Sequence, residues 1–282
     1  MDPHNILCPV DFSGLSAFAL RYASMIARCT PGARLTAAYA DSFSPPPYFT
    51  ASRLEEMNTQ FRDSFREAAA ALQRFVEKVL GEEAAGSVDS RIVEALPVDG
   101  IRMLTRELKA DLVVMGTHGR SGVNRFMLGS VAERTLRESE VPVLTVRGDT
   151  GKAVEQPKNI LCPVNDSPAA REALSAAAQL ARCFSASLTV LHVKEKDTAQ
   201  GTGELCAWVP DEVRSRCSVS ELTREGDPAR EIVSFARESS YDLLVLGARH
   251  RLFFDTTVLG STVARVVPHA PCPVLTVMTK SV

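Results

Sequence analysis

The sequence predicts an α/β protein of two tandem domains, each a parallel sheet with helices on both faces. Two observations predict this: short apolar runs alternate with helical patterns along the chain, and the second half of the chain repeats the first. Asn5-Ile-Leu-Cys-Pro-Val-Asp11 returns as Asn159-Ile-Leu-Cys-Pro-Val-Asn165, and Pro142-Val-Leu-Thr-Val146 returns as Pro273-Val-Leu-Thr-Val277. This period far exceeds the ~50 residues of solenoid repeats, so it indicates two homologous domains.

A polar stretch over residues 148–157, with two glycines and a closing proline, is the expected linker. The domains are therefore expected at residues 1–147 and 158–282. Asn159 follows Asn5 by 154 residues, whereas Pro273 follows Pro142 by 131, so the second domain is shorter. We expect the shortening between residues 193 and 218, where a polar stretch with a short helix near residues 210–216 replaces a long helix.

Local patterns predict the elements of the first half in order. Ser13 is a good N-cap, and the apolar residues after it recur at helical spacing as far as Arg28. Three consecutive prolines predict a loop at residues 43–48, and a long amphipathic helix follows at residues 54–79. The predicted strands are residues 5–10, 34–40, 90–96, 111–115 and 143–146. The remaining predicted helices are residues 99–108 and 130–138.

Composition excludes several functional classes. The chain is 45% hydrophobic and 23% charged, as in ordinary soluble proteins. A net charge of −2 gives no electrostatic basis for binding nucleic acid or an anionic membrane. No apolar run approaches the ~18 residues of a membrane span, and the N-terminus does not resemble a signal peptide. We therefore expect a cytoplasmic protein, and the odd number of seven cysteines favours reduced thiols.

The motif Gly116-x2-Gly119-x9-Gly129-Ser130 predicts a phosphate site. It follows the apolar run at residues 112–115 and leads into a predicted helix. Glycines allow positive φ and close backbone approach to an anion, and a helix N-terminus offers unpaired N–H groups. The loop is neither a Walker loop nor GxGxxG.

A second loop converges on the same place. In parallel α/β sheets, ligands bind beyond the carboxyl ends of the strands at the point where the strand order reverses. Asp11 follows the first strand and the glycine loop follows the fourth, so both are expected there.

Pro9-Val10-Asp11-Phe-Ser13, the glycine spacing and the closing Val-Pro-Val-Leu-Thr-Val strand together resemble the universal stress protein family, twice over nearly the whole chain. The resemblance implies two Rossmann-like, five-stranded domains of the adenine nucleotide α-hydrolase type. It also implies a cytoplasmic stress-response role, and an ATP site in members that keep the glycine motif.

The resemblance assigns a nucleotide-binding role to particular residues. Pro9, Val10 and Asp11 match the turn that faces adenosine, and Ala40 matches the strand end whose backbone reads adenine. Met115 and Gly116 match the start of the phosphate loop. The triphosphate is expected to lie against Gly119, Gly129, Ser130 and Val131. Arg120 and Arg125 lie between the glycines. Two roles stay open for them: contact with the γ-phosphate, or a position on a solvated face of the loop.

The second domain departs from this pattern. Asn165 replaces Asp11, and His250 stands where Gly119 stood, in Gly247-Ala-Arg-His250-x9-Gly260-Ser261. A side chain there fills space that phosphates need. The expected ligand is therefore ATP, or ADP or AMP, with Mg²⁺, bound mainly by the first domain.

The expected function is a nucleotide-binding stress-response regulator rather than an enzyme, because no catalytic constellation is evident. One alternative is a slow ATPase or nucleotide-dependent transferase, and another is a scaffold without nucleotide. No metal site is expected, since no CxxC or HxxxH spacing supports zinc binding by the cysteines and histidines of the second half. Family members dimerise through the last strand, so we expect a pseudo-dimer of the two domains; a homodimer stays open.

Overall fold

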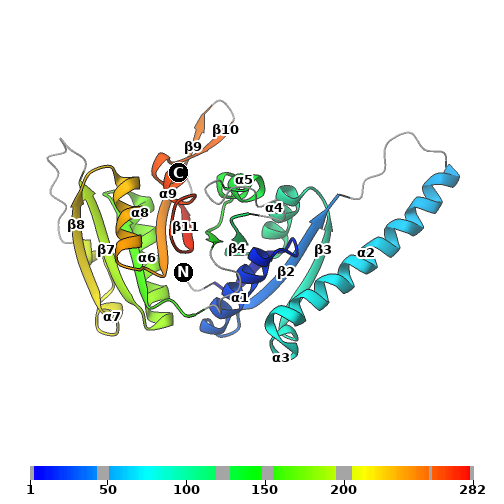
Figure 1. Ribbon diagram of the computed structural model, residues 1–282, viewed down its shortest axis with the longest axis horizontal. Helices are drawn as coiled ribbons and strands as arrows, with labels where there is room; N and C mark the ends of the chain where they lie inside the picture. The colour runs from blue at the N-terminus through cyan, green and yellow to red at the C-terminus, as the bar shows by residue number, and fades with distance from the viewer. Residues whose placement is uncertain are drawn as a thin grey trace.

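One sheet runs through both halves of the chain in the computed structural model (Figure 1). The structure describes residues 3–42, 51–118, 128–147, 155–194, 205–253 and 256–279, with backbone only for residues 51–62, 206, 249–253 and 256–258. The strand order is β3-β2-β1-β4-β5-β11-β9-β6-β7-β8, and β10 pairs with β9 off this path. Within each half these ten strands pair in parallel, as the alternating pattern predicted.

The first half follows the predicted order of elements. Its elements are β1 (Asn5–Pro9), α1 (Gly14–Cys29), β2 (Arg34–Asp41), α2 (Ala51–Leu80), α3 (Glu82–Ala85), β3 (Val88–Glu94), α4 (Pro97–Glu107), β4 (Leu112–Gly116), α5 (Ser130–Glu138) and β5 (Val143–Val146). The short helix α3 was not predicted, and β3 begins before the predicted residue 90. Ser13 caps α1 as expected, since its Oγ accepts a hydrogen bond from Ser16 N at 3.2 Å.

The second half repeats this order with a shorter insertion. Its elements are β6 (Asn159–Val164), α6 (Pro168–Phe184), β7 (Ser187–Lys194), the 3-10 helix η1 (Leu205–Trp208), α7 (Asp211–Arg214), β8 (Val219–Glu225), α8 (Pro228–Glu238), β9 (Leu243–Phe253), β10 (Thr256–Leu259), α9 (Ser261–Val266) and β11 (Val274–Thr279). The short helix expected near residues 210–216 is α7.

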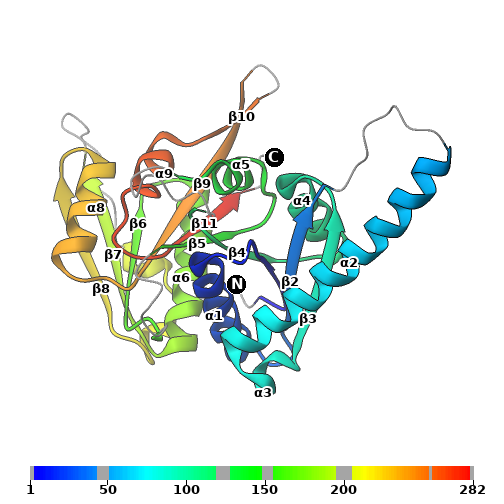
Figure 2. The ribbon, with the colours of Figure 1, turned by 45° about the vertical axis from the view of Figure 1, so that its right-hand side comes forward.

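One feature of the second half was not predicted. β9 continues to Phe253 and turns back as β10 in an antiparallel hairpin. The hairpin extends away from the rest of the sheet (Figure 2). Two features explain it: β9 stays paired with β11 as far as Arg249 and Thr279, and residues 252–258 are rich in β-branched and aromatic types.

Helices cover both faces of the sheet, as predicted. Helices α1, α2 and α6 bury residues such as Leu20, Leu72 and Leu174 in one core cluster. The second cluster takes Leu104 and Leu136 from α4 and α5, together with residues of α8 and α9. None of the helices in the described ranges is both long and apolar enough to cross a membrane.

The two halves are joined through their last strands. β5 and β11 pair antiparallel, with Leu144 opposite Leu275, and Thr145 Oγ1 donates to Val274 O at 3.2 Å. The guanidinium of Arg147 also donates to the carbonyls of Pro268 and Ala270 beyond α9.

A disulfide between Cys29 and Cys183 also crosses between the halves. The expectation of reduced thiols is therefore wrong for this pair. An odd cysteine count could not reveal it, because the pairing depends on α1 and α6 lying side by side. Four further cysteines of the described chain are free: Cys8, Cys162, Cys217 and Cys272.

Candidate functional site

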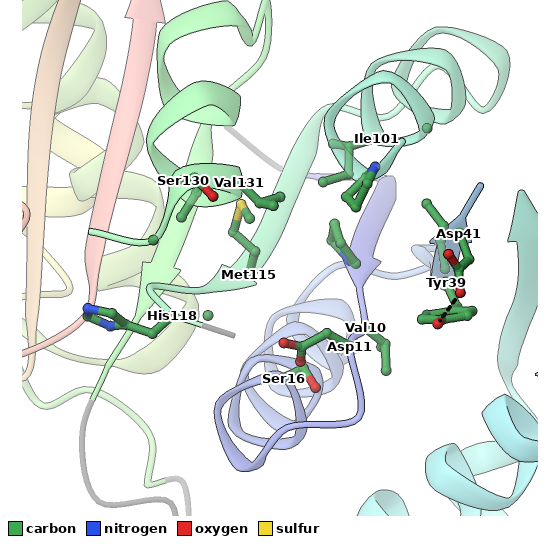
Figure 3. A pocket seen from close by; sticks show the side chains of 18 of the residues that line it. Val10, Asp11, Ser16, Tyr39, Asp41, Ile101, Met115, His118, Ser130 and Val131 are labelled. Atoms are coloured by element: carbon green, nitrogen blue, oxygen red, sulfur yellow. Dashed lines mark hydrogen bonds between the residues drawn. The ribbon is translucent and has the colours of Figure 1, made fainter. Parts of the chain in front are cut away.

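A cavity of about 440 Å³ lies in the first half at the carboxyl ends of β1, β2 and β4. Helices α4 and α5 form its other walls. Its volume is within the range of small-ligand pockets, ~300–1,000 Å³. Figure 3 shows Val10 and Asp11 on one side of it, Ile101 opposite, and Ser130 and Val131 at the start of α5. The site therefore lies where the topology rule places ligands.

Nine of the eleven predicted ligand-binding residues line this cavity: Pro9, Val10, Asp11, Ala40, Met115, Gly116, Gly129, Ser130 and Val131. The tertiary structure thus gathers residues that are up to 122 positions apart in the chain. Gly119 and Arg120 lie outside the described residues, as does Arg125.

The turn after β1 fixes the orientation of Asp11. Its Oδ1 accepts hydrogen bonds from Ser13 N at 3.0 Å and from Ser13 Oγ at 2.5 Å. Phe12 adopts a left-handed φ of 62°, and its ring packs on Tyr39 with centroids 4.9 Å apart. The carboxylate is therefore held at the edge of the cavity as a hydrogen-bond acceptor.

The end of β2 presents backbone groups to the cavity. Along a strand, successive residues point their N–H and C=O to opposite sides. Ala38 O faces β1, because it accepts from Val10 N at 2.7 Å, and Asp41 O faces β3, because it accepts from Ala95 N at 3.1 Å. Ala40 therefore faces the β1 side, where the described strand pairing stops at Pro9 and Ala38. The backbone N–H and C=O of Ala40 therefore lie side by side at the cavity.

The start of α5 forms the opposite end of the site. Gly129 is the N-cap and makes no side-chain cap hydrogen bond. The first intrahelical bond runs from Glu133 N to Gly129 O at 2.8 Å. The N–H groups of Ser130, Val131 and Ala132 thus precede the helical hydrogen bonding, and all three residues line the cavity. Such a helix start favours anions.

The structure gives Gly116 a packing role. Neither Gly116 nor Gly129 has a positive φ, so the expectation of unusual backbone angles at these two glycines is wrong. Instead, a Cβ added at Gly116 would lie 2.9 Å from Leu15 Cβ. The glycine lets α1 pack tightly against the end of β4. Gly247 does the same in the second half, where an added Cβ would lie 2.3 Å from Ala169 O.

His118 is turned away from the cluster around Asp11. In Figure 3 its ring points away from Val10, Asp11 and Ser16. Its Nδ1 lies 3.0 Å from Thr117 Oγ1, and its Nε2 is buried without a hydrogen-bond partner among the described residues. Burial, and to a lesser extent the charge of Arg147, lowers the pKa of His118. This favours a neutral imidazole near neutral pH.

The sequence reasoning missed part of the lining. Tyr39 OH donates to Asp41 Oδ2 at 2.8 Å at the end of β2, and Gly100 and Ile101 on α4 close the cavity. A glycine inside a helical pattern was the available signal for Gly100, because such glycines often have a packing or functional reason.

The second half differs at the position that corresponds to Gly100. Both α4 and α8 begin with proline, and their fourth residues are Gly100 and Glu231. The Glu231 Cγ lies 3.1 Å from where a Cβ of Gly226 would stand, and its Oε2 lies 3.3 Å from Arg224 Nη1. His192, in the place of Tyr39, is buried against Val164 O at 3.2 Å. Glu231 thus places a side chain where the first half has a glycine.

The zinc alternative gains no support from the described residues, where no group of three or more His, Cys, Asp or Glu side chains could hold a metal. The His250 side chain is not described, so its predicted clash with phosphate stays a prediction. The backbone of His250 lies in the β9–β10 hairpin.

The fold and cavity define a two-repeat α/β protein with a ligand site beyond the strand ends of its first half. The sequence profile of the universal stress protein family matches residues 3–147 and 157–278. The chain therefore belongs to the universal stress protein family, as its motifs indicated.

Individual relatives agree with this assignment. A universal stress protein of Mycolicibacterium smegmatis is 26% identical, over 97% of both chains. One of Methanocaldococcus jannaschii is 33% identical, over 50% of this chain and 81% of its own. The crystal structure of a universal stress protein from Archaeoglobus fulgidus superimposes with a TM-score of 0.68 at 20% identity, covering 100% of this chain and 98% of that chain. At that identity the structural likeness shows the fold alone.

Proposed function

We propose that the first half binds an adenine nucleotide and that the protein acts as a nucleotide-dependent regulator. The observation that carries this proposal is the pair of backbone groups of Ala40, exposed at one end of a cavity whose other end is a helix start. Adenine presents a donor, the N6 amino group, beside the acceptor N1 on one edge. A strand residue that offers N–H and C=O together matches that edge.

The rest of the cavity supports a nucleotide whose adenine lies at Ala40 and whose phosphates lie at the start of α5. Val10, Ile101 and Leu104 offer apolar surface for the faces of a planar base. Asp11 is held where it can accept hydrogen bonds from ribose hydroxyls, and charge-assisted bonds of this kind are strong. The phosphates would then lie at α5, where Ser130 adds a hydroxyl to the N–H groups. Gly119 and Arg120 extend this end of the site in the sequence, and Mg²⁺ would enter as the counter-ion of a triphosphate.

We expect one nucleotide per chain. Glu231 and His192 stand in the second half where the first half has Gly100 and Tyr39, and Asn165 replaces Asp11. The two halves would then form a pseudo-dimer through β5 and β11, with one binding half and one non-binding half. Nucleotide binding would shift the protein between two conformations or two assembly states, because the nucleotide has a different affinity for each of them.

We infer regulation rather than catalysis because the hydroxyl–base pair in the described cavity lining, Thr117 Oγ1 at 3.0 Å from His118 Nδ1, involves a threonine that is only 2% exposed, which leaves little of its hydroxyl open to a ligand. His118 is turned away from Asp11, and Ser16 Oγ donates to Ser13 O at 3.0 Å. Turnover of ATP faster than ~1 s⁻¹, an ordinary rate for an enzyme, would instead favour the ATPase or transferase alternative. Failure to bind any nucleotide would favour a scaffold.

Calorimetric titration with Mg-ATP tests the proposal, using Asp11→Asn and Asn165→Asp as a matched pair. The wild type should bind one equivalent. Asp11→Asn keeps the shape of the turn but removes a charged acceptor worth ~1.5–3 kcal/mol, so binding should weaken by about 10- to 100-fold. Asn165→Asp should leave affinity unchanged. Two tight equivalents, or equal losses in both variants, would contradict the assignment.

A further inference from the structure

The disulfide between Cys29 and Cys183 joins equivalent positions of the two repeats. Cys29 is the last residue of α1, and Cys183 is next to last in α6, 154 residues later. Their Cα atoms are 5.7 Å apart, a usual distance for a disulfide. The bond therefore fixes the carboxyl ends of two helices that belong to different halves.

The surfaces beside the disulfide are apolar and incompletely packed. A small cavity of about 10 Å³ lies between the halves. Tyr22 and Met25 of α1 and Leu180 and Phe184 of α6 contribute to its lining. The β5–β11 pairing joins the halves within the sheet, whereas apolar contacts between α1 and α6 have no fixed direction, so the disulfide adds the covalent link between these two helices.

The paired cysteines are more exposed than three of the free ones. Cys29 and Cys183 are half-buried, whereas Cys8, Cys162 and Cys272 are buried. Burial raises the pKa of these three thiols, which makes them poor nucleophiles at neutral pH. Cys217, half-buried and free, has no cysteine partner in the described chain.

We propose that Cys29 and Cys183 form a reversible redox site, acted on by small thiols and hydroperoxides, that locks and unlocks the two halves. This inference is independent of nucleotide binding.

Helix α1 also links the redox site rigidly to the rest of the first half. Helix α1 spans 16 residues from Cys29 back to Gly14, about 24 Å, and there Leu15 packs on Gly116.

The chemistry is ordinary thiol–disulfide exchange. In reduction, a small thiolate attacks one sulfur and forms a mixed disulfide, and the other cysteine leaves as a thiolate that takes up a proton. A second small thiolate then attacks the mixed disulfide, which releases the oxidised small disulfide and the second cysteine. In oxidation, one cysteine thiolate attacks a hydroperoxide to give a sulfenic acid and an alcohol or water. The second cysteine attacks that sulfur, forming the disulfide and water.

Peptide mapping of the wild-type protein tests the pairing directly. The protein is treated with hydrogen peroxide, denatured, alkylated and cut with trypsin without reductant. We expect one species that joins residues 29–34 to residues 183–194, lost after dithiothreitol treatment. Alkylation of both cysteines after peroxide treatment would overturn the proposal. So would a pair that stays fully oxidised in excess glutathione, because the site would then not be reversible.

Thermal unfolding tests the lock. Reduction should lower the unfolding temperature of the wild type by about 5–10 °C, given the usual contribution of a disulfide that closes a long loop. The double variant Cys29→Ser, Cys183→Ser should unfold at the reduced value under both conditions. Cys217→Ser is the matched control and should keep the difference. A wild type whose unfolding temperature is the same when oxidised and reduced would overturn the proposal.

Discussion

Gly100 on α4 lies directly against Ala40 at the end of β2: a Cβ added at Gly100 would be 2.8 Å from Ala40 Cβ. Real Cβ atoms do not approach this closely, so the glycine is what allows α4 to pack here. The contact joins a wall of the cavity to the strand residue whose backbone faces it. In the second half, Glu231 occupies the position that corresponds to Gly100.

We therefore expect Gly100→Ala to weaken nucleotide binding. The new methyl group must push α4 or the end of β2 away, an overpacking cost of ~1–3 kcal/mol, partly offset by the ~1 kcal/mol gain in helix propensity. We expect about a tenfold loss of Mg-ATP affinity and a loss of about 1 kcal/mol in the free energy of unfolding. Titration and urea unfolding measure the two.

Gly86→Ala is the control for this variant. A Cβ at Gly86 would lie 3.6 Å from Glu83 O, an ordinary contact, so both affinity and stability should stay close to the wild type. Equal effects of the two substitutions would show that the Gly100–Ala40 contact has no special role.

Ser130→Ala should weaken binding of nucleotides with several phosphates. The variant keeps the N–H groups of α5 but removes one neutral hydrogen bond worth ~0.5–1.5 kcal/mol, so Mg-ATP affinity should fall by about 3- to 10-fold. AMP, with a single phosphate next to the ribose, should lose less. Ser261→Ala makes the same change at the start of α9 and should have no effect. A larger loss for Ser261→Ala would move the phosphate site to the second half.

The lowered pKa of His118 makes stability depend on pH. Because burial and Arg147 lower the folded-state pKa, the unfolded chain binds the proton more tightly. This contribution to the free energy of unfolding is complete above the ordinary histidine pKa of about 6.5. It is lost as the pH falls below that value and through the folded-state pKa.

Urea unfolding between about pH 8 and pH 5 measures this effect. His118→Gln should lose less stability on acidification than the wild type, whereas His269→Gln, at an exposed position after α9, should behave like the wild type. Parallel pH profiles for the wild type and His118→Gln would refute the assignment.

Arg147→Met should destabilise the contact between the halves. Arg147 donates to the carbonyls of Pro268 and Ala270, and the corresponding residue of the second half is Met278, so the substitution copies one repeat into the other. Loss of charged hydrogen bonds that leaves carbonyls unpaired should cost ~2–3 kcal/mol in the free energy of unfolding. Urea unfolding measures this loss.

Arg106→Met is the matched control. Arg106 Nη2 lies 2.6 Å from Glu140 Oε1, but both side chains are exposed, at 64% and 63%. An exposed pair contributes less than ~1 kcal/mol. If both variants lose the same stability, the Arg147 contact does not hold the halves together.

Part of the cavity could be predicted from the sequence, because two of its loops carry recognisable motifs. The turn after β1 and the glycine motif after β4 are contiguous patterns, and parallel topology brings the ends of such strands together. Tyr39 and Asp41 could not be selected in this way, and the local signal for Gly100 was a glycine inside a helical pattern. Their role depends on which residue of α4 meets which residue of β2, and that depends on packing.

The sequence by itself determined the two repeats, the alternation of strands with helices, the family and the two loops that meet at the site, because periodicity and short motifs are properties of neighbouring residues. Only the tertiary structure decided the β9–β10 hairpin, the packing role of Gly116 and the Cys29–Cys183 pair. The packing at Gly116 and the disulfide are contacts between segments far apart in the chain, and the hairpin extends a strand that is paired with the distant strand β11. Such contacts become definite only when the helices and strands are packed at close distance.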